Sequence, residues 1–193
     1  QMEQMFQAMY DGYKDYVESI VLFKQDGTLL QVKPALSVEA SEDVAQADWF
    51  TQAFERSENI HFFPPQIQDC FEKDTGFPWV IPMSRFVQIS EGNSIREGVL
   101  LINIKYSALS EIFRNDNPGG ERYAFLMDAT GQLIYHPRHA LINSGFMETP
   151  PASLASYEDG SYETEINGEA VFCCVKTVGY TLSLIHISER TRH

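Results

Sequence analysis

The sequence predicts an α+β protein with a long N-terminal helix followed by two tandem β-rich modules, each built on an antiparallel sheet. Apolar residues at the N-terminus recur with helical spacing, and apolar runs of strand length alternate with turn residues along the rest of the chain. The order strand, turn, strand occurs twice, with the turn glycines Gly27 and Gly131 about a hundred positions apart, a distance typical of a repeated module. At 193 residues and 44% hydrophobic content, the chain is long enough for two small cores.

The composition restricts the classes of function. Lys and Arg number 14 against 27 Asp and Glu, so the net charge of −13 predicts no basic surface, and nucleic acid is not expected as a partner. No apolar run approaches the ~20 residues that cross a bilayer, and the chain begins with Gln1, so we expect a soluble fragment of a longer protein. Cys70, Cys173 and Cys174 are an odd number without metal spacing, so they predict neither a disulfide framework nor a zinc site.

An amphipathic helix is predicted over residues 1–18. The apolar residues that recur every three or four positions are Met2, Met5, Phe6, Met9, Tyr13, Tyr16, Val17 and Ile20. Residues 19–23 then form a β-branched apolar run, a turn follows around Gly27, and residues 28–32 resume as a second strand. These strands predict a hairpin that opens the first module, residues 19–114.

The rest of the first module combines a short helix, a strand pair and a second helix. Asp48 is expected to cap the short helix, whose apolar face consists of Trp49, Phe50, Ala53 and Phe54. Proline and glycine then predict a loop, after which residues 79–89 and 98–104 predict two strands joined by a polar turn. A helix at 109–113 follows, and the breaker-rich segment 115–120 ends the module.

The second module is predicted over residues 121–181. Residues 123–127 and 132–135 form strands on either side of the turn at Gly131. A later hairpin around Asn167-Gly168 adds two strands, and a last strand is expected to begin after it.

Residues 182–193, LSLIHISERTRH, resemble the translated read-through of a transposase-type sequencing adapter, with Arg190 where the usual translation has Pro. We therefore expect this tail to be non-native and its deletion to leave the melting temperature nearly unchanged, apart from the loss of any fortuitous strand pairing by residues 181–187. The alternative is a genuine terminal strand, because residues 181–187 alternate tolerably between apolar and polar side chains. On the first interpretation, His186 and His193 leave the set of candidate ligands.

Four segments, taken in order, have the pattern of a known family. They are Asp48-Trp49-Phe50-Thr51-Gln52-Ala53, the strand with Ser84-Arg85, Gly98-Val99-Leu100-Leu101-Ile102-Asn103-Ile104, and Leu126-Met127-Asp128-Ala129-Thr130-Gly131-Gln132-Leu133-Ile134-Tyr135-His136-Pro137. In this order, after a long N-terminal helix, they resemble a double Cache domain, which contains two PAS-like modules. The resemblance covers roughly Met2 to Tyr180.

The double Cache domain is the extracytoplasmic sensor of bacterial histidine kinases and chemoreceptors. The resemblance therefore implies a small-molecule sensor of a membrane-anchored receptor, a histidine kinase rather than a chemoreceptor, whose transmembrane helices lie outside this fragment. No cofactor and no catalytic activity are expected. The Met- and Tyr-rich stripe of the first helix offers a surface for a homodimer, and core packing is its alternative. The alternative class of function is that of a secreted α+β protein, an interaction protein or an enzyme, without a signalling role.

The resemblance also implies a ligand site in the first module. Amino-acid-binding members carry an Arg two positions before the Trp of the short helix and an Asp on the later strand, where this sequence has Ala47 and Asn103. Without a guanidinium for the α-carboxylate and a carboxylate for the α-ammonium, a standard amino acid is disfavoured. The candidate binding residues are Trp49, Phe50, Ser84, Arg85 and Asn103, a set that suits an uncharged or anionic small molecule, a sugar fragment included.

Each candidate also has a purely structural interpretation. For Trp49 and Phe50 it is core packing of the helix on the sheet, since aromatic side chains dominate cores by area. For Arg85 it is a salt bridge on the sheet, and for Asn103 it is a hydrogen bond to an adjacent loop.

Two further patterns are weak. His136 and His139 form a His-x-x-His pair, but Pro137 breaks the helix that would align them, so no metal site is expected. Cys173 and Cys174 are neighbours on a predicted strand, where their side chains point to opposite faces and pack rather than bridge. No nucleophile with a base, phosphate loop or paired carboxylates stands out, so the sequence does not support catalysis.

Overall fold

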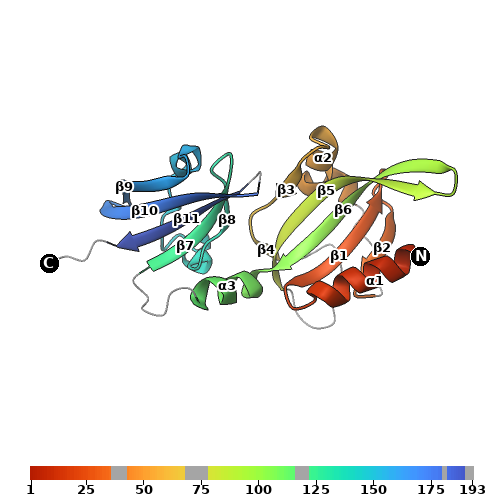
Figure 1. Ribbon diagram of the computed structural model, residues 1–193, viewed down its shortest axis with the longest axis horizontal. Coiled ribbons are helices and arrows are strands. Elements are labelled where there is room, and N and C mark those ends of the chain that lie inside the picture. The colour runs from red at the N-terminus through yellow and green to blue at the C-terminus, as the bar shows by residue number, and fades with distance from the viewer. Residues whose placement is uncertain (36–42, 68–77, 116–121, 180–181, 190–193) are drawn as a thin grey trace. The chain divides into compact units, whose positions relative to one another are not determined.

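The computed structural model describes residues 1–35, 43–67, 78–115, 122–179 and 182–189 of the chain (Figure 1). The chain divides into two compact units, Gln1–Ala108 and Leu109–His193. Each unit contains one antiparallel sheet, and no sheet joins the two among the described strands. The predicted fold class, α+β with an N-terminal helix and antiparallel sheets, is confirmed.

The division between the units falls inside the helix α3 (Tyr106–Asn115). The sequence places the module boundary slightly later, in the breaker-rich segment 115–120. Residues 116–120 lie outside the described part of the chain. The two units are described separately below.

The sheet of the first unit has the strand order β2-β1-β6-β5-β3, and β4 also pairs with β5. Its strands are β1 (Val17–Lys24), β2 (Leu29–Lys33), β3 (Ile60–Phe62), β4 (Gln66–Ile67), β5 (Trp79–Glu91) and β6 (Ser94–Lys105). The predicted hairpin around Gly27 is β1–β2, and β5–β6 is a long hairpin that closes at Gly92. The stretch around Pro64-Pro65, predicted as loop, instead carries the short strands β3 and β4 at the edge of the sheet.

The N-terminal helix α1 covers Met2–Tyr13 and is shorter than predicted. After it, the Tyr16 N–H donates to the Tyr13 carbonyl in a turn at 2.9 Å, and Val17 begins β1. The β-branched residues of 17–21 favour the strand, and this preference overrides the helical spacing of their apolar side chains. Phe6 is the buried residue of α1, and it packs on the sheet against the cluster that contains Ile20.

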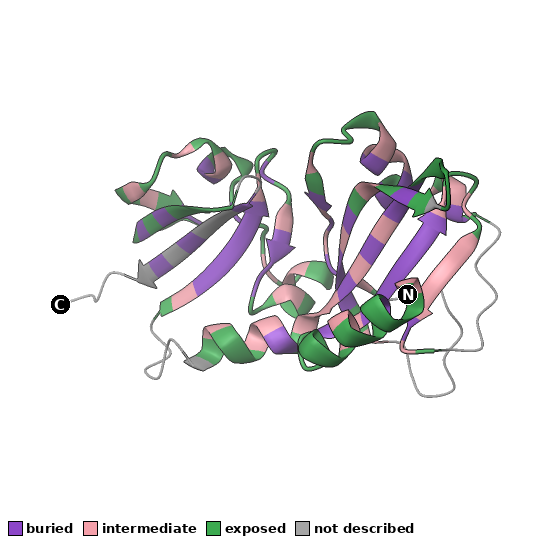
Figure 2. Cartoon of the chain, turned by 45° about the vertical axis from the view of Figure 1, so that its right-hand side comes forward, coloured by how far each residue is buried: buried purple, intermediate pink, exposed green. Residues whose placement is uncertain are grey.

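Alternate residues of β1 belong to two different cores, one on each face of the sheet. Ile20 and Leu22 face α1, whereas Val21 and Phe23 face the 3-10 helix η1 (Val44–Gln46) and the helix α2 (Asp48–Glu55). Figure 2 shows β1 buried along nearly its whole length.

The start of α2 differs from the prediction. Ala47, in an extended conformation, is the N-cap residue, and Asp48 lies in the first helical turn without a side-chain capping hydrogen bond. The predicted Asp48 cap is therefore wrong by one residue. The Asp48 carboxylate still lies at the helix N-terminus, where the helix dipole favours a negative charge.

The sheet of the second unit has the order β8-β7-β11-β10-β9. Its strands are β7 (Arg122–Asp128), β8 (Leu133–Tyr135), β9 (Gly160–Ile166), β10 (Glu169–Val178) and β11 (Leu182–Glu189). Between β8 and β9 lie two short elements that the sequence did not predict, α4 (His139–Asn143) and the 3-10 helix η2 (Ala152–Ser156). The core of this unit consists of Phe125, Met127, Leu154, Ile166, Val171, Cys173, Val175, Ile185 and Ile187.

The terminal segment forms the central strand of this sheet. β11 pairs antiparallel with both β7 and β10, and Ile185 and Ile187 are buried in the core. Residues 182–189 thus adopt the strand conformation of the alternative interpretation, and the strand pairing excepted from the expected small effect of deletion is that of a central strand. Strand pairing depends only on the amino-acid sequence, so it does not reveal where the coding DNA came from. The adapter origin of this segment stays a prediction, and sequencing the source locus tests it.

Candidate functional site

The candidate site lies on the face of the first sheet that α2 covers. Strand register places three rows of side chains on this face: Phe23, Val99 and Phe86; then Val21, Leu101 and Ser84; then Ser19, Asn103 and Pro82. The first row is apolar and the last row carries an amide and a hydroxyl. The face therefore changes from apolar to polar along its strands.

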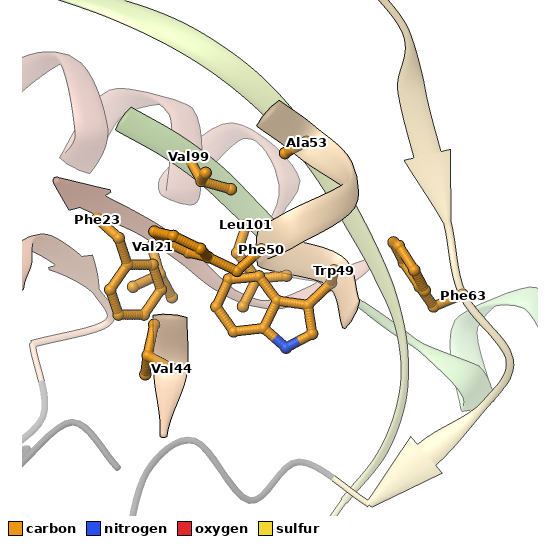
Figure 3. Packing of buried hydrophobic residues seen from close by; sticks show 9 residues of the cluster. All are labelled: Val21, Phe23, Val44, Trp49, Phe50, Ala53, Phe63, Val99 and Leu101. Atoms are coloured by element: carbon orange, nitrogen blue, oxygen red, sulfur yellow. The ribbon is translucent and has the colours of Figure 1, made fainter. Parts of the chain in front are cut away.

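Trp49 and Phe50 fill the apolar part of this face. Trp49 is 6% exposed and Phe50 is 3% exposed, and their ring centroids are 5.9 Å apart in an edge-on arrangement. The Phe23 ring lies 5.4 Å from that of Trp49, and Figure 3 shows these rings with Val44 and Phe63 in the same cluster. Both aromatic candidates are therefore members of the core, as their structural interpretation expects, and Trp49 is also next to the polar rows.

The polar rows carry two buried hydrogen bonds. The Ser84 hydroxyl donates to the Trp49 carbonyl at 2.7 Å, which fixes α2 to β5. The Asn103 amide donates through Nδ2 to the Ser19 hydroxyl at 2.9 Å, and Asn103 is only 1% exposed. This bond leaves the Asn103 Oδ1 acceptor and the Ser19 hydroxyl hydrogen available for a further partner.

Arg85 does not join the other candidates. It follows Ser84 on β5, so its side chain points to the opposite face of the sheet, and it is exposed to solvent. Its cross-strand partner, Leu100, packs with the cluster on the α1 side. The structure thus brings together Trp49, Phe50, Ser84 and Asn103 and leaves Arg85 outside this group.

One functional candidate, Ser19, was missed by the sequence analysis. It is 2% exposed and lies beside Asn103 in the strand register. A polar residue inside the apolar run 17–23 was the available signal. With Ser19 included, the polar end of this face presents hydroxyl and amide groups and no charged candidate residue.

The weak patterns also have defined positions. His136 is fully buried, and its Nδ1 accepts the backbone N–H of Arg138 at 3.0 Å. Burial, then the charge of Arg138 and the neighbouring His139, lowers the pKa of His136 to about 4, so its ring is neutral near pH 7. Within the described ranges, no group of three or more His, Cys, Asp or Glu could hold a metal ion. Cys173 is buried and Cys174 is exposed, whereas Cys70 lies outside the described residues.

Comparison with known proteins identifies the fold. The sequence matches the family model dCache_1, described as Cache domain, over residues 1–192. No curated protein sequence matches the chain. In the described part of the chain, none of the helices has the length and apolar character of a membrane span.

Several solved structures are similar. The ligand-binding domain of the Pseudomonas aeruginosa PAO1 amino acid chemoreceptor PctB, in complex with L-Arg, has a TM-score of 0.64 and 18% identity, covering 97% of this chain and 72% of that chain. The ligand-binding domain of the amino acid chemoreceptor PctC of the same organism, in complex with GABA, has a TM-score of 0.59 and 18% identity. The match covers 92% of this chain and 76% of that chain. The ligand-binding domain of the Pseudomonas fluorescens chemoreceptor CtaA, in complex with L-leucine, has a TM-score of 0.60 and 17% identity. The match covers 93% of this chain and 74% of that chain.

Proposed function

We propose, from the premise that this chain belongs to the Cache domain family, that it senses a small uncharged ligand at the polar end of the α2 face. Cache domains are ligand-binding sensor domains, typically the extracytoplasmic parts of membrane receptors. The observation that carries the proposal is the buried Asn103–Ser19 pair beside Trp49 on an otherwise apolar face. Buried polar groups on a core-forming face are unusual enough to indicate a role.

The proposed ligand class follows from the groups on this face. Trp49 supplies an apolar surface, and the Asn103 and Ser19 groups can each donate and accept hydrogen bonds. Ala47 and Asn103 stand where the amino-acid-binding pattern has Arg and Asp, and Arg85 lies on the other face. None of the candidate residues on this face carries a guanidinium group that could bind an anion. An anionic ligand is therefore disfavoured, and a hydroxyl-rich neutral molecule such as a sugar fragment fits best. The similar structures were solved with amino acids and GABA, a class that the test below includes.

A thermal-shift screen of sugars, organic acids and amino acids on the whole chain tests the ligand class. A ligand at 100 times its dissociation constant adds about 2.7 kcal/mol of apparent stability, which is a clear shift in melting temperature. We expect a neutral polyhydroxylated compound to give this shift. A shift produced only by amino acids would overturn the proposed ligand class.

Calorimetry on two variants then tests the site. Asn103→Leu keeps the side-chain volume but removes the amide, and it should weaken the hit by about 1–3 kcal/mol because a hydrogen-bonded polar contact is lost. Arg85→Ala is the matched control on the opposite face and should bind like the wild type. Equal affinity of Asn103→Leu and the wild type, with both folded by their melting curves, would place the ligand elsewhere.

The receptor type is a further part of the proposal. On the resemblance given above, the output region downstream is a histidine kinase of a two-component system, and the solved relatives are chemoreceptors. In that arrangement α1 leads from a membrane segment to the first sheet, and its exposed Met5 and Tyr13 are available to a second copy. Sequencing the gene on both sides distinguishes a kinase from a methyl-accepting region. A cleavable leader and a stop codon after Tyr180 would instead support a secreted protein without signalling.

A further inference from the structure

A second cavity lies entirely within the second unit. It has a volume of about 340 Å³, and its walls come from α3, β7 and the segment that follows β8. The lining residues are Ser110, Phe113, Arg114, Arg122, Tyr123, Ala124, Tyr135, Pro137 and Arg138. Three of the chain's 14 Lys and Arg residues therefore meet at one concave surface in a protein whose net charge is −13.

The walls of this cavity are held by aromatic contacts. Phe113 and Tyr135 stack with their ring centroids 4.8 Å apart, which fastens α3 to the end of β8. The Arg138 guanidinium lies 5.6 Å from the centre of the Tyr123 ring, in cation–π range. The hydrogen bond from the Arg138 N–H to the buried His136 ring fixes the backbone from which this guanidinium extends.

The charges at this surface have no ion-pair partner within the described part of the chain. No ion pair joins Arg114, Arg122 or Arg138 to a carboxylate of the described residues. Glu111 lies one turn before Arg114 on α3 without forming one. Guanidinium groups present planar forks of N–H donors that match the oxygens of carboxylates and phosphates. Three such groups around an aromatic-walled hollow are the expected arrangement for a small anion.

We propose that this cavity is a binding site for a small oxyanion, a carboxylate or a phosphate, that is separate from the ligand site of the first unit. The Arg122 and Arg138 guanidinium groups hold the anion from β7 and from the segment after β8, and Arg114 closes on it from α3. The Tyr135 hydroxyl, which is hydrogen bonded with Ser110, lies at the same wall. This site does not depend on the proposed sensing of a neutral ligand.

Calorimetric titration of the whole chain with inorganic phosphate and, separately, with succinate tests the site and distinguishes the two anions. We expect one of them to bind with one-to-one stoichiometry, more weakly at high than at low ionic strength, because the attraction between charges is screened. Glycerol is the uncharged control and should give no heat of binding.

Single-charge variants locate the bound anion. Arg122→Gln and Arg138→Gln should each weaken binding about tenfold or more, since each removes a charge-assisted hydrogen bond. Arg85→Gln removes the same charge from an exposed site in the first unit, and it should bind the anion like the wild type. Asn103→Leu should also leave anion binding unchanged, so failure of this proposal and failure of the proposed sensor site are separable.

Three outcomes would overturn the proposal. The first is no binding of either anion at low ionic strength. The second is equal weakening by Arg85→Gln, which would indicate a nonspecific effect of net charge. The third is unchanged affinity in both Arg122→Gln and Arg138→Gln when their melting curves show a folded second unit.

Discussion

A buried side-chain amide requires a hydrogen-bond partner, and at Asn103 that partner is the hydroxyl of Ser19. Asn103 was found from the sequence through its place in a resembling motif, whereas Ser19 required knowledge of which strands are neighbours. Arg85 shows a different limit. Its residue type made it a candidate, yet the alternation of side chains along a strand already separates it from Ser84. The packing of Trp49 likewise depends on long-range register, which the sequence does not contain.

Substitution of Ser19 tests the buried pair as a structural element. Ser19→Ala removes the acceptor of the Asn103 amide, so the free energy of unfolding should fall by about 1–3 kcal/mol. Ser90→Ala, at an exposed position of β5, is the control and should change the free energy of unfolding by no more than about 0.5 kcal/mol. Urea denaturation measures both. A Ser19→Ala variant as stable as the control would mean that another group takes over this hydrogen bond.

His136 predicts a pH dependence of stability. Its folded pKa of about 4 lies below the ordinary histidine pKa of 6.5, so the unfolded chain takes up the proton first as the pH falls. The free energy of unfolding should therefore be highest above pH 6.5 and decline as the pH falls towards and through 4, by an amount on the order of 3 kcal/mol. His139, whose pKa is also lowered by burial, adds to the same slope.

Denaturation curves between pH 7 and pH 4 measure this effect, and His136→Gln identifies its source. The variant should be less stable at pH 7, because the ring contacts with Tyr123 and Phe125 are lost, but its stability should depend less on pH. A slope as steep as that of the wild type would assign the pH dependence to other groups.

At the level of elements, strands were easier to predict than helices. Each long strand contains an apolar run bounded by turn residues, and turns at Gly27, Gly131 and Asn167-Gly168 fixed the hairpins. The end of α1 was predicted too late because apolar residues of β1 happen to continue its spacing. The short elements α4 and η2 have no such periodicity, and tertiary packing of Leu154 rather than local preference holds η2 in place.

The two module glycines predict unequal effects of substitution. Both have positive φ, +81° at Gly27 and +84° at Gly131, so alanine is strained at either position. A Cβ at Gly27 would lie 3.3 Å from Ala45, whereas at Gly131 it would lie 2.5 Å from the Ala152 Cβ and 2.6 Å from the Ala152 carbonyl oxygen. Gly131→Ala should therefore lower the stability of the second unit by more than Gly27→Ala lowers the stability of the first unit.

Gly92→Ala is the reference for strain alone, because its φ is +61° and no atom lies within 4 Å of the added Cβ. We expect a loss of about 1 kcal/mol for Gly92→Ala and a clearly larger loss for Gly131→Ala, measured by thermal unfolding. If the two losses were equal, the backbone of η2 would be free to move away from the turn.

For the whole molecule, the important feature is that each unit has its own sheet and its own core. The cluster around Trp49 and the cluster around Phe125 share no residue. The sequence repeat predicted this division into two modules. It did not predict that residues 182–189 complete the second core, because their resemblance to a translated sequencing adapter argued against a structural role.

Truncation after residue 181 tests that role. The truncated chain loses the strand that pairs with β7 and β10, together with the buried Ile185 and Ile187, so the second unit should not fold cooperatively. The first unit should keep its own transition in a calorimetric scan. The control is a chain with Ile185→Val and Ile187→Val, which keeps the strand pattern and should keep both transitions. An unchanged second transition in the truncated chain would show that β11 is dispensable.

The place of β11 also sets the order of events while the chain is being made. In the second sheet the strand that comes last in sequence lies between β7 and β10, so both neighbours leave the ribosome without the partner that joins them. The β9–β10 hairpin can form early because its contacts are local, but β7 is joined to β10 only when β11 emerges. Until then, β7 and β10 each expose an unpaired edge to other chains. Aggregation of the newly made second unit is therefore most favoured in the interval before β11 emerges, and a chaperone acting in that interval would have the largest effect on yield.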